Sequence, residues 1–228
     1  KQQESELYVV HESFLYGLHD AMLPYMANAK VGLDIGAHIG TFSVFAAKRS
    51  HATIYAIEPE PENFAHLVQN IRLNKLEKRI IPTQAAILSE SGEKPFYTFQ
   101  NHALSSLYTD HAAKYTSASG SAVTGTRNVR TVNLEDFFTE HNIAFCDFMK
   151  IDAEEAERDI FYNLPKHMYK RIGVMGMEIS GMSEEGDQKL VSHIVNMGFS
   201  VSRPFGEYFF VNKRLPGYLQ GHVESRTW

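Results

Sequence analysis

The residues from Val31 to Pro59 constrain the fold more than any other part of the chain. The apolar segment Val31–Ile35 is followed by Gly36 and Gly40, and a second apolar segment over 54–57 ends at Glu58. This order predicts a strand, a glycine turn, a helix, a second strand and then a carboxylate. Glycine tolerates positive φ and close approach of a ligand, and a carboxylate about twenty residues later can accept hydrogen bonds from ribose hydroxyls. The layout predicts a site for an adenosine-containing cofactor.

His38 distinguishes between two classes of such cofactors. The dinucleotide fingerprint G-x-G-x-x-G needs a second glycine so that the backbone can meet a pyrophosphate, and His38 stands at that position. An imidazole there crowds a pyrophosphate, whereas S-adenosylmethionine has none. The turn therefore favours S-adenosylmethionine, and a nicotinamide-dependent dehydrogenase is the weaker alternative.

Composition narrows the class of protein and its partners. The chain has 228 residues, of which 43% are hydrophobic, which fits one domain with a full-sized core. Its 22 basic and 27 acidic residues show no cationic cluster, so we expect no nucleic-acid partner. Cys146 is the single cysteine, which excludes an internal disulfide and favours a cytoplasmic location. No apolar run reaches the roughly eighteen residues that span a bilayer, so we expect no membrane partner.

Strands and helices alternate along the rest of the chain. The helical spacing of Leu7, Val10, Phe14, Leu18 and Met22 predicts an N-terminal helix within residues 1–29. Further strands are expected at 53–57, 80–87, 94–100, 146–152, 172–179, 199–202 and 208–211, with helices after Gly40, at 61–71, 153–163 and 190–195, and a long loop at 101–128. The pattern predicts an α/β fold with a doubly wound, mostly parallel sheet and an antiparallel C-terminal strand.

Two charged residues end the strand expected at 146–152. Lys150 and Asp152 are two residues apart and therefore point to the same face, at the edge where ligands gather in open α/β sheets. Asp152 is the candidate general base, and Lys150 would orient the acceptor or lower its pKa; a structural ion pair is the alternative. Asp152, Glu154, Glu157 and Glu178 could instead hold a divalent metal, although acidic residues also favour the first turn of a helix. No metal is predicted.

Three motifs resemble the FkbM family of S-adenosylmethionine-dependent methyltransferases. The turn over 34–40 is similar to the family's D-x-G-A-[NH]-x-G, and Glu58-Pro59 is followed by Asn70 on the next helix. The third motif is Lys150-Ile151-Asp152-Ala153-Glu154, where the family has K-x-D-x-E-G-x-E. This chain has Glu155 in place of the glycine, which narrows the pocket, adds a negative charge or reflects a diverged acceptor.

The resemblance implies the class I methyltransferase fold, which is Rossmann-like with a seven-stranded sheet, and S-adenosylmethionine as cofactor. The implied cofactor contacts are Asp34, Gly36, Ala37, His38, Ile39, Gly40, Thr41, Glu58, Pro59 and Ala86, and the implied catalytic set is Asp152, Lys150 and Glu154. The implied reaction is methyl transfer to a hydroxyl of a sugar, polyketide or related small molecule. A diverged, non-catalytic binding module is the alternative. We expect a single methyltransferase domain over 1–228, with an N-terminal helix at 1–29, a catalytic core at 30–212 and a tail at 213–228.

Overall fold

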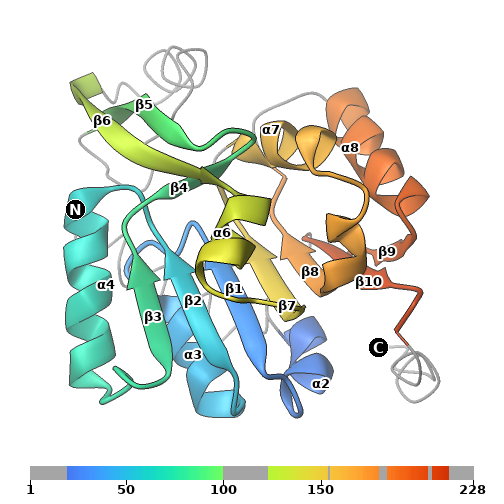
Figure 1. Ribbon diagram of the computed structural model, residues 1–228, viewed down its shortest axis with the longest axis horizontal. Coiled ribbons are helices and arrows are strands. Elements are labelled where there is room, and N and C mark those ends of the chain that lie inside the picture. The colour runs from blue at the N-terminus through green and yellow to red at the C-terminus, as the bar shows by residue number, and fades with distance from the viewer. Residues whose placement is uncertain (1–19, 100–122, 154, 180–183, 205–206, 216–228) are drawn as a thin grey trace.

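The computed structural model describes residues 20–99, 123–153, 155–179, 184–204 and 207–215. A seven-stranded sheet with the order β3-β2-β1-β7-β8-β10-β9 forms its centre (Figure 1). Every pair within this sheet is parallel except those made by β10, which is antiparallel to both β8 and β9. The mostly parallel α/β sheet and its antiparallel C-terminal strand are confirmed. The expected N-terminal helix lies largely outside the described residues, as does the tail beyond residue 215.

The first half of the sheet follows the local sequence pattern closely. Strand β1 (Val31–Ile35), helix α3 (Thr41–Arg49), strand β2 (Thr53–Ile57) and helix α4 (Pro61–Leu73) lie where the sequence predicts them. Helix α4 begins at Pro61 because the Glu60 side chain accepts hydrogen bonds from the backbone N–H of Glu62 and Asn63 at 2.7 and 2.8 Å. Two short helices, η1 (Asp20–Met22) and α2 (Leu23–Met26), precede β1.

The single strand expected over 80–87 is wrong. The chain forms β3 (Ile80–Thr83) in the large sheet and then β4 (Ala86–Leu88) in a second sheet of three strands, ordered β4-β6-β5. Strand β5 (Gly92–Phe99) matches the expected extra strand, but β6 (Val123–Asn133) includes residues 123–128, which the sequence assigned to a loop. The rest of that loop lies outside the described residues.

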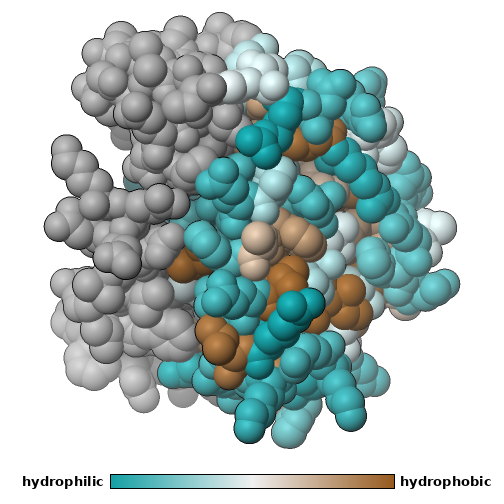
Figure 2. Space-filling view, turned by 90° about the vertical axis from the view of Figure 1, so that its left-hand side faces the viewer, coloured by the Kyte–Doolittle hydropathy of each residue, from teal (hydrophilic) through white to brown (hydrophobic). Residues whose placement is uncertain are grey.

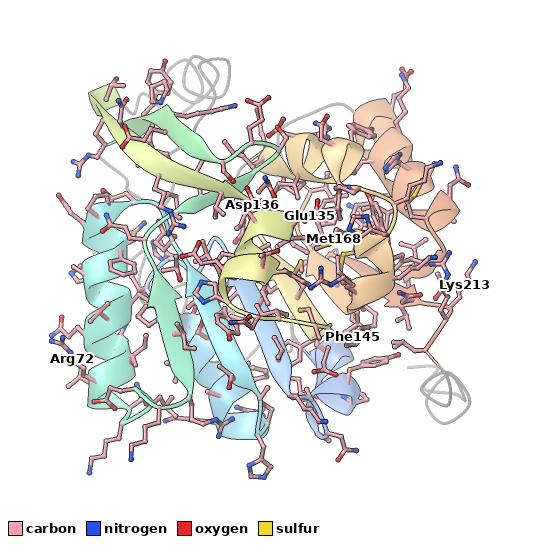
Figure 3. The ribbon with its side chains drawn as sticks, in the orientation of Figure 1. Arg72, Glu135, Asp136, Phe145, Met168 and Lys213 are labelled. Carbon is pink, nitrogen blue, oxygen red and sulfur yellow. The ribbon has the colours of Figure 1, made fainter. Side chains whose placement is uncertain are left out.

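Side-chain hydrogen bonds fix the small sheet to the helices beside it. Helix α6 (Leu134–Glu140), which the sequence analysis did not predict, follows β6 directly, and Asp136 in its first turn lies in front of the large sheet (Figure 3). Ser91 donates to Asp136 at 2.5 Å, and Ser89 donates through its Oγ and its backbone N to Asp159 at 2.8 and 2.9 Å. The turn between β4 and β5 is therefore tied to two helices.

The second half of the large sheet carries the strands of the candidate site. It contains β7 (Cys146–Ile151), α7 (Ala156–Asn163), η3 (Met168–Arg171), β8 (Ile172–Met177), α8 (Glu184–Asn196), β9 (Phe199–Ser202) and β10 (Tyr208–Asn212). Helix α7 begins at Ala156, three residues later than expected, because Glu155 takes a left-handed backbone conformation with φ +78°. The hairpin of β9 and β10 is confirmed.

Two hydrophobic cores lie on opposite faces of the large sheet. The α7-side core contains Leu33, Ile35, Met149, Ile151 and the buried residues of α6, α7 and α8. The α3-side core contains Phe148, Val174, Phe209 and the buried residues of α2, α3 and α4, and Figure 1 shows α3 behind the sheet and α6 in front. Because side chains alternate along a strand, Asp34 and Lys150 point to the α3 side.

The surface formed by α4 and β3 is mostly hydrophilic, with separate hydrophobic side chains (Figure 2). Leu73 is 70% exposed and Ile81 37% exposed on these two elements. Isolated exposed apolar side chains are ordinary in folded proteins and do not mark a site. Within the described residues, no helix has the length and apolar character needed to cross a membrane.

Candidate functional site

The turn between β1 and α3 depends on its glycines. Gly36 and Gly40 have φ of +75° and +87°. A Cβ on Gly36 would lie 1.8 Å from the carbonyl oxygen of Asp152, and one on Gly40 would lie 2.4 Å from Leu67 Cδ1. Any side chain at 36 would therefore push the turn away from the end of β7. The backbone N–H groups of Gly36 and Ala37 both donate to the carbonyl of Ile57 at 3.0 Å, which holds the turn beside β2.

His38 and Asn70 complete the turn. His38 has φ +51°, and its backbone N–H donates to Glu58 Oε2 at 2.8 Å. Asn70 on α4 donates through Nδ2 to the carbonyl of Ile39 at 2.8 Å. The residues that the sequence associates with the cofactor turn are therefore connected to one another by hydrogen bonds.

Glu58 ends β2 next to this turn. Its Oε1 accepts from the backbone N–H of Glu60 at 2.9 Å, and the residue is 5% exposed. Burial raises the pKa of Glu58 to about 7, although the hydrogen bonds from Glu60 and His38 lower it. The Asn63 side chain is a third donor to this carboxylate, whose remaining lone pair can accept from a further donor such as a ribose hydroxyl.

Asp34 supports the turn from the interior. Its side chain is 0% exposed, and Ser43 on α3 donates to its Oδ2 at 2.6 Å. Its Oδ1 accepts no hydrogen bond from the described residues and lies 3.9 Å from Lys150 Nζ. Burial raises the pKa of Asp34, and the Lys150 charge opposes that shift.

Lys150 joins the ends of β1 and β7. Its Nζ donates to the carbonyl of Gly36 at 3.1 Å and to Asp152 Oδ2 at 3.0 Å, so the expectation that Lys150 and Asp152 share a face is confirmed. Burial lowers the pKa of Lys150, but the charges of Asp152 and Asp34 outweigh it and the net shift is upward. Lys150 is therefore a permanent cation, with 16% of its side chain exposed, whereas 33% of the Asp152 side chain is exposed.

The acidic residues after Asp152 do not share one role. Glu154 lies outside the described residues. Glu157 is 0% exposed, and its Oε1 accepts from the backbone N–H of Ala153 at 2.8 Å, so it closes the loop that leads into α7. Glu155 occupies the left-handed conformation that glycine favours. In the part of the chain that the structure describes, no group of three or more His, Cys, Asp or Glu side chains could hold a metal ion.

The remaining predicted cofactor contacts lie on several elements. Ile39 is buried in the turn, Thr41 begins α3, Pro59 follows Glu58 and Ala86 begins β4 in the small sheet. Sequence reasoning missed Ser43, the donor to Asp34, because a serine within a helix carries no local signal. It also missed Glu207, whose charge acts on Lys150 from the terminal hairpin.

Comparison with known proteins identifies a matching family and locally similar sequences. The family described as "Methyltransferase FkbM domain" matches residues 34–210. Two tRNA (guanine(37)-N(1))-methyltransferases match locally: the protein from Batrachochytrium dendrobatidis is 36% identical over 74 residues, and that from Xenopus tropicalis is 37% identical over 62 residues. These segments cover 32% and 27% of this chain, and 16% and 12% of the relatives, so the chain spans only a small part of their length.

The fold is similar to solved methylase structures of very low sequence identity. An rRNA methylase from Streptococcus thermophilus superposes with a TM-score of 0.51 at 9% identity, covering 84% of this chain and 90% of the other. A protein described as an rRNA-methylase candidate from Clostridium thermocellum gives a TM-score of 0.53 at 8% identity, covering 86% and 92%. At this identity the likeness concerns the fold alone.

Proposed function

Because this chain belongs to the FkbM methyltransferase domain family and is an S-adenosylmethionine-dependent methyltransferase, we propose that it transfers the methyl group to a hydroxyl oxygen of a small molecule. One observation carries the proposal. Lys150 Nζ binds both the carbonyl of Gly36 in the cofactor turn and the carboxylate of Asp152, at 3.1 and 3.0 Å. The cofactor turn and the candidate base are thus held next to each other at the carboxyl edge of the sheet, where ligands of open α/β sheets bind.

The residues of the turn fit the cofactor. Glu58 would accept hydrogen bonds from the ribose hydroxyls, and Asp34 Oδ1 is a buried acceptor suited to an ammonium group or a bridging water. Gly36 allows the turn to pack against the carbonyl of Asp152, which a side chain would prevent, so the turn stays next to the candidate base. Ala37, His38, Ile39, Gly40, Thr41, Pro59 and Ala86 are proposed as the remaining contacts.

The bound cofactor supplies a methyl group on a positively charged sulfur. Transfer of this methyl group to an acceptor oxygen would leave the electron pair of the carbon–sulfur bond on sulfur and release the hydroxyl proton. Asp152 accepts the hydroxyl proton, because its carboxylate is the exposed partner of Lys150. Correct alignment of the reactants can contribute roughly 7 to 11 kcal/mol and a general base about 3 to 5 kcal/mol. Alignment is therefore the larger part of the proposed mechanism.

The charge beside Asp152 favours an acceptor without phosphate groups. Asp152 and Glu178 follow β7 and β8, Glu207 precedes the neighbouring β10, and the charge of Lys150 is already paired with Asp152. A phosphate backbone needs lysines and arginines to displace its counterions. The tRNA acceptors named for the two curated relatives are the alternative, and the local sequence similarity is the observation that favours them. An assay that offers small molecules and tRNA separately therefore decides between the two classes of acceptor.

Calorimetric titration with S-adenosylhomocysteine tests the cofactor site without a known acceptor. We expect one-to-one binding to the wild-type protein, and at least tenfold weaker binding to Glu58→Ala, since hydrogen bonds to a charged group contribute about 1.5 to 3 kcal/mol. Glu185→Ala on the exposed face of α8 is the matched control. Unchanged affinity of Glu58→Ala would remove the ribose assignment.

Radiolabelled S-adenosylmethionine then tests the acceptor. Hydroxylated small molecules and a total tRNA fraction are offered separately, and we expect label to enter only the small molecules. Asp152→Asn should lower turnover at saturating substrates by about a hundredfold or more while S-adenosylhomocysteine still binds. Labelling of tRNA alone would overturn the acceptor class, and full turnover by Asp152→Asn would remove its role as base.

A further inference from the structure

The register of the large sheet places three carboxylates in one row. Ile35, Ile151, Met177 and Tyr208 lie opposite one another on β1, β7, β8 and β10. The next level contains Gly36, Asp152, Glu178 and Glu207. Backbone hydrogen bonds continue the register to Asp152 and Glu178, since Asp152 N donates to Ile35 O and Glu178 N donates to Ile151 O, both at 3.0 Å, and Glu207 directly precedes Tyr208, the first residue of β10. Glu207 therefore lies two strands away from Asp152.

The row below explains how Glu207 can act on Lys150. Asp34, Lys150, Gly176 and Phe209 lie opposite one another on the same four strands. Side chains two residues apart on a strand share a face, so Lys150 lies on the α3 side with Phe148. Phe209 is in the α3-side core, and the same alternation, extended one residue before β10, puts Glu207 on that side too. Gly176 puts no side chain between them, and a Cβ there would already lie 3.0 Å from Met22 Sδ. Two strand spacings amount to about 10 Å, which a lysine and a glutamate can bridge electrostatically.

We propose that Glu207 is a positioning residue that acts through Lys150, stabilising its ammonium group beside the cofactor turn with a third carboxylate, on the side of β7 that faces the terminal hairpin. Lys150 has Asp152 at 3.0 Å on one side and Asp34 at 3.9 Å beneath it. The Glu207 charge also favours the charged lysine, alongside those of Asp152 and Asp34. Glu207 precedes β10, so the terminal hairpin contributes to the balance of charge around Lys150.

This inference deepens the proposed function, because the turn that Lys150 contacts is the proposed cofactor site. Its first test nevertheless needs no cofactor. In protein labelled with ¹⁵N-lysine, the partly buried Lys150 ammonium is observed by NMR and assigned with Lys150→Arg. We expect Glu207→Gln to shift this signal and to accelerate exchange of its protons with water. Glu185→Gln, which removes an exposed carboxylate paired with Lys189, is the control and should leave the signal unchanged.

A double-mutant cycle of S-adenosylhomocysteine affinity provides the second test. In the wild-type background, Glu207→Gln should weaken S-adenosylhomocysteine binding about threefold or more. The conservative variant Glu207→Asp should keep most of the wild-type affinity. In the Lys150→Gln background, Glu207→Gln should weaken binding by less than a further twofold. An unchanged Lys150 signal, or an equal effect in both backgrounds, would overturn the proposal. A shifted Lys150 signal in a protein that binds no S-adenosylhomocysteine would support the positioning role and refute the cofactor site instead.

Discussion

Glu155 offers a test of whether the backbone after β7 requires glycine. The residue has φ +78° and ψ −3°, which is the left-handed region. In this region, a residue with a Cβ lowers the free energy of unfolding by about 1 to 2 kcal/mol through steric strain. Glycine avoids that strain but lowers the free energy of unfolding by about 0.5 to 1 kcal/mol, because it gives the unfolded chain more conformational freedom. Glu155→Gly and Glu155→Ala both remove the carboxylate, so their difference reports the backbone alone. We expect the glycine variant to be more stable than the alanine variant by about 1 kcal/mol.

The expected difference is measurable by urea denaturation and by thermal unfolding. An unfolding entropy of about 2.1 cal/mol/K per residue over 228 residues converts 1 kcal/mol into a Tm difference of about 2 °C. At Lys75, which has φ +57°, the glycine variant should likewise be more stable than the alanine variant. Lys189 in the middle of α8 should show the reverse order by about 1 kcal/mol, because glycine is a poor helix former. An alanine variant at 155 as stable as the glycine variant would refute the assignment of strain.

Three further predictions concern the turn and its carboxylates. Gly36→Ala should lower stability by about 3 kcal/mol or more, because its Cβ would lie 1.8 Å from the Asp152 carbonyl at a φ of +75°; a change below 1 kcal/mol in urea denaturation would contradict this packing. Ser43→Ala should cost about 1 to 3 kcal/mol, since it removes the donor to the buried Asp34, and a loss within 0.5 kcal/mol would argue against that hydrogen bond. Burial raises the pKa of Glu58 from 4.5 to about 7. Between these two pH values the folded state binds more protons than the unfolded state, so the free energy of unfolding falls as the pH rises, by up to roughly 3 kcal/mol. The free energy of unfolding of Glu58→Gln relative to wild type should therefore increase between pH 5 and pH 8 in urea titrations, and a constant difference would show that Glu58 does not titrate in this window.

The parts of the fold that the sequence predicts correctly are those set by local pattern. The two strands around the glycine turn are short apolar segments bounded by turn residues, and the helix after Gly40 buries Phe42 and Phe45 as its spacing requires. Glu58 was identified because the carboxylate follows directly on a strand. These features depend on residues close to one another in the chain.

The errors arise where tertiary contacts decide the outcome. Residues 80–88 are apolar almost throughout, so nothing local indicates that β3 and β4 belong to different sheets. The sheet partner of β4 is β6, more than forty residues later, where Ala86 lies opposite Thr131. The late start of α7 has a local cause instead, because the Glu157 carboxylate accepts a hydrogen bond from the N–H of Ala153, four residues earlier, and keeps that residue in the preceding loop.

The charge network of the site could be predicted only in part for the same reason. Lys150 and Asp152 are two residues apart, so their shared face follows from the strand alone. The hydrogen bond from Lys150 to Gly36 and the position of Glu207 two strands away follow from the pairing of four strands, which no single segment reveals. A one-residue slip of β10 against β8 would turn Glu207 to the other face of the sheet. It would also move Phe209 and Val211 out of the α3-side core, where both are 7% exposed. Burial of these two side chains therefore sets the register that brings Glu207 to the face of Lys150, and the hydrophobic pattern of the hairpin governs the electrostatics of the site.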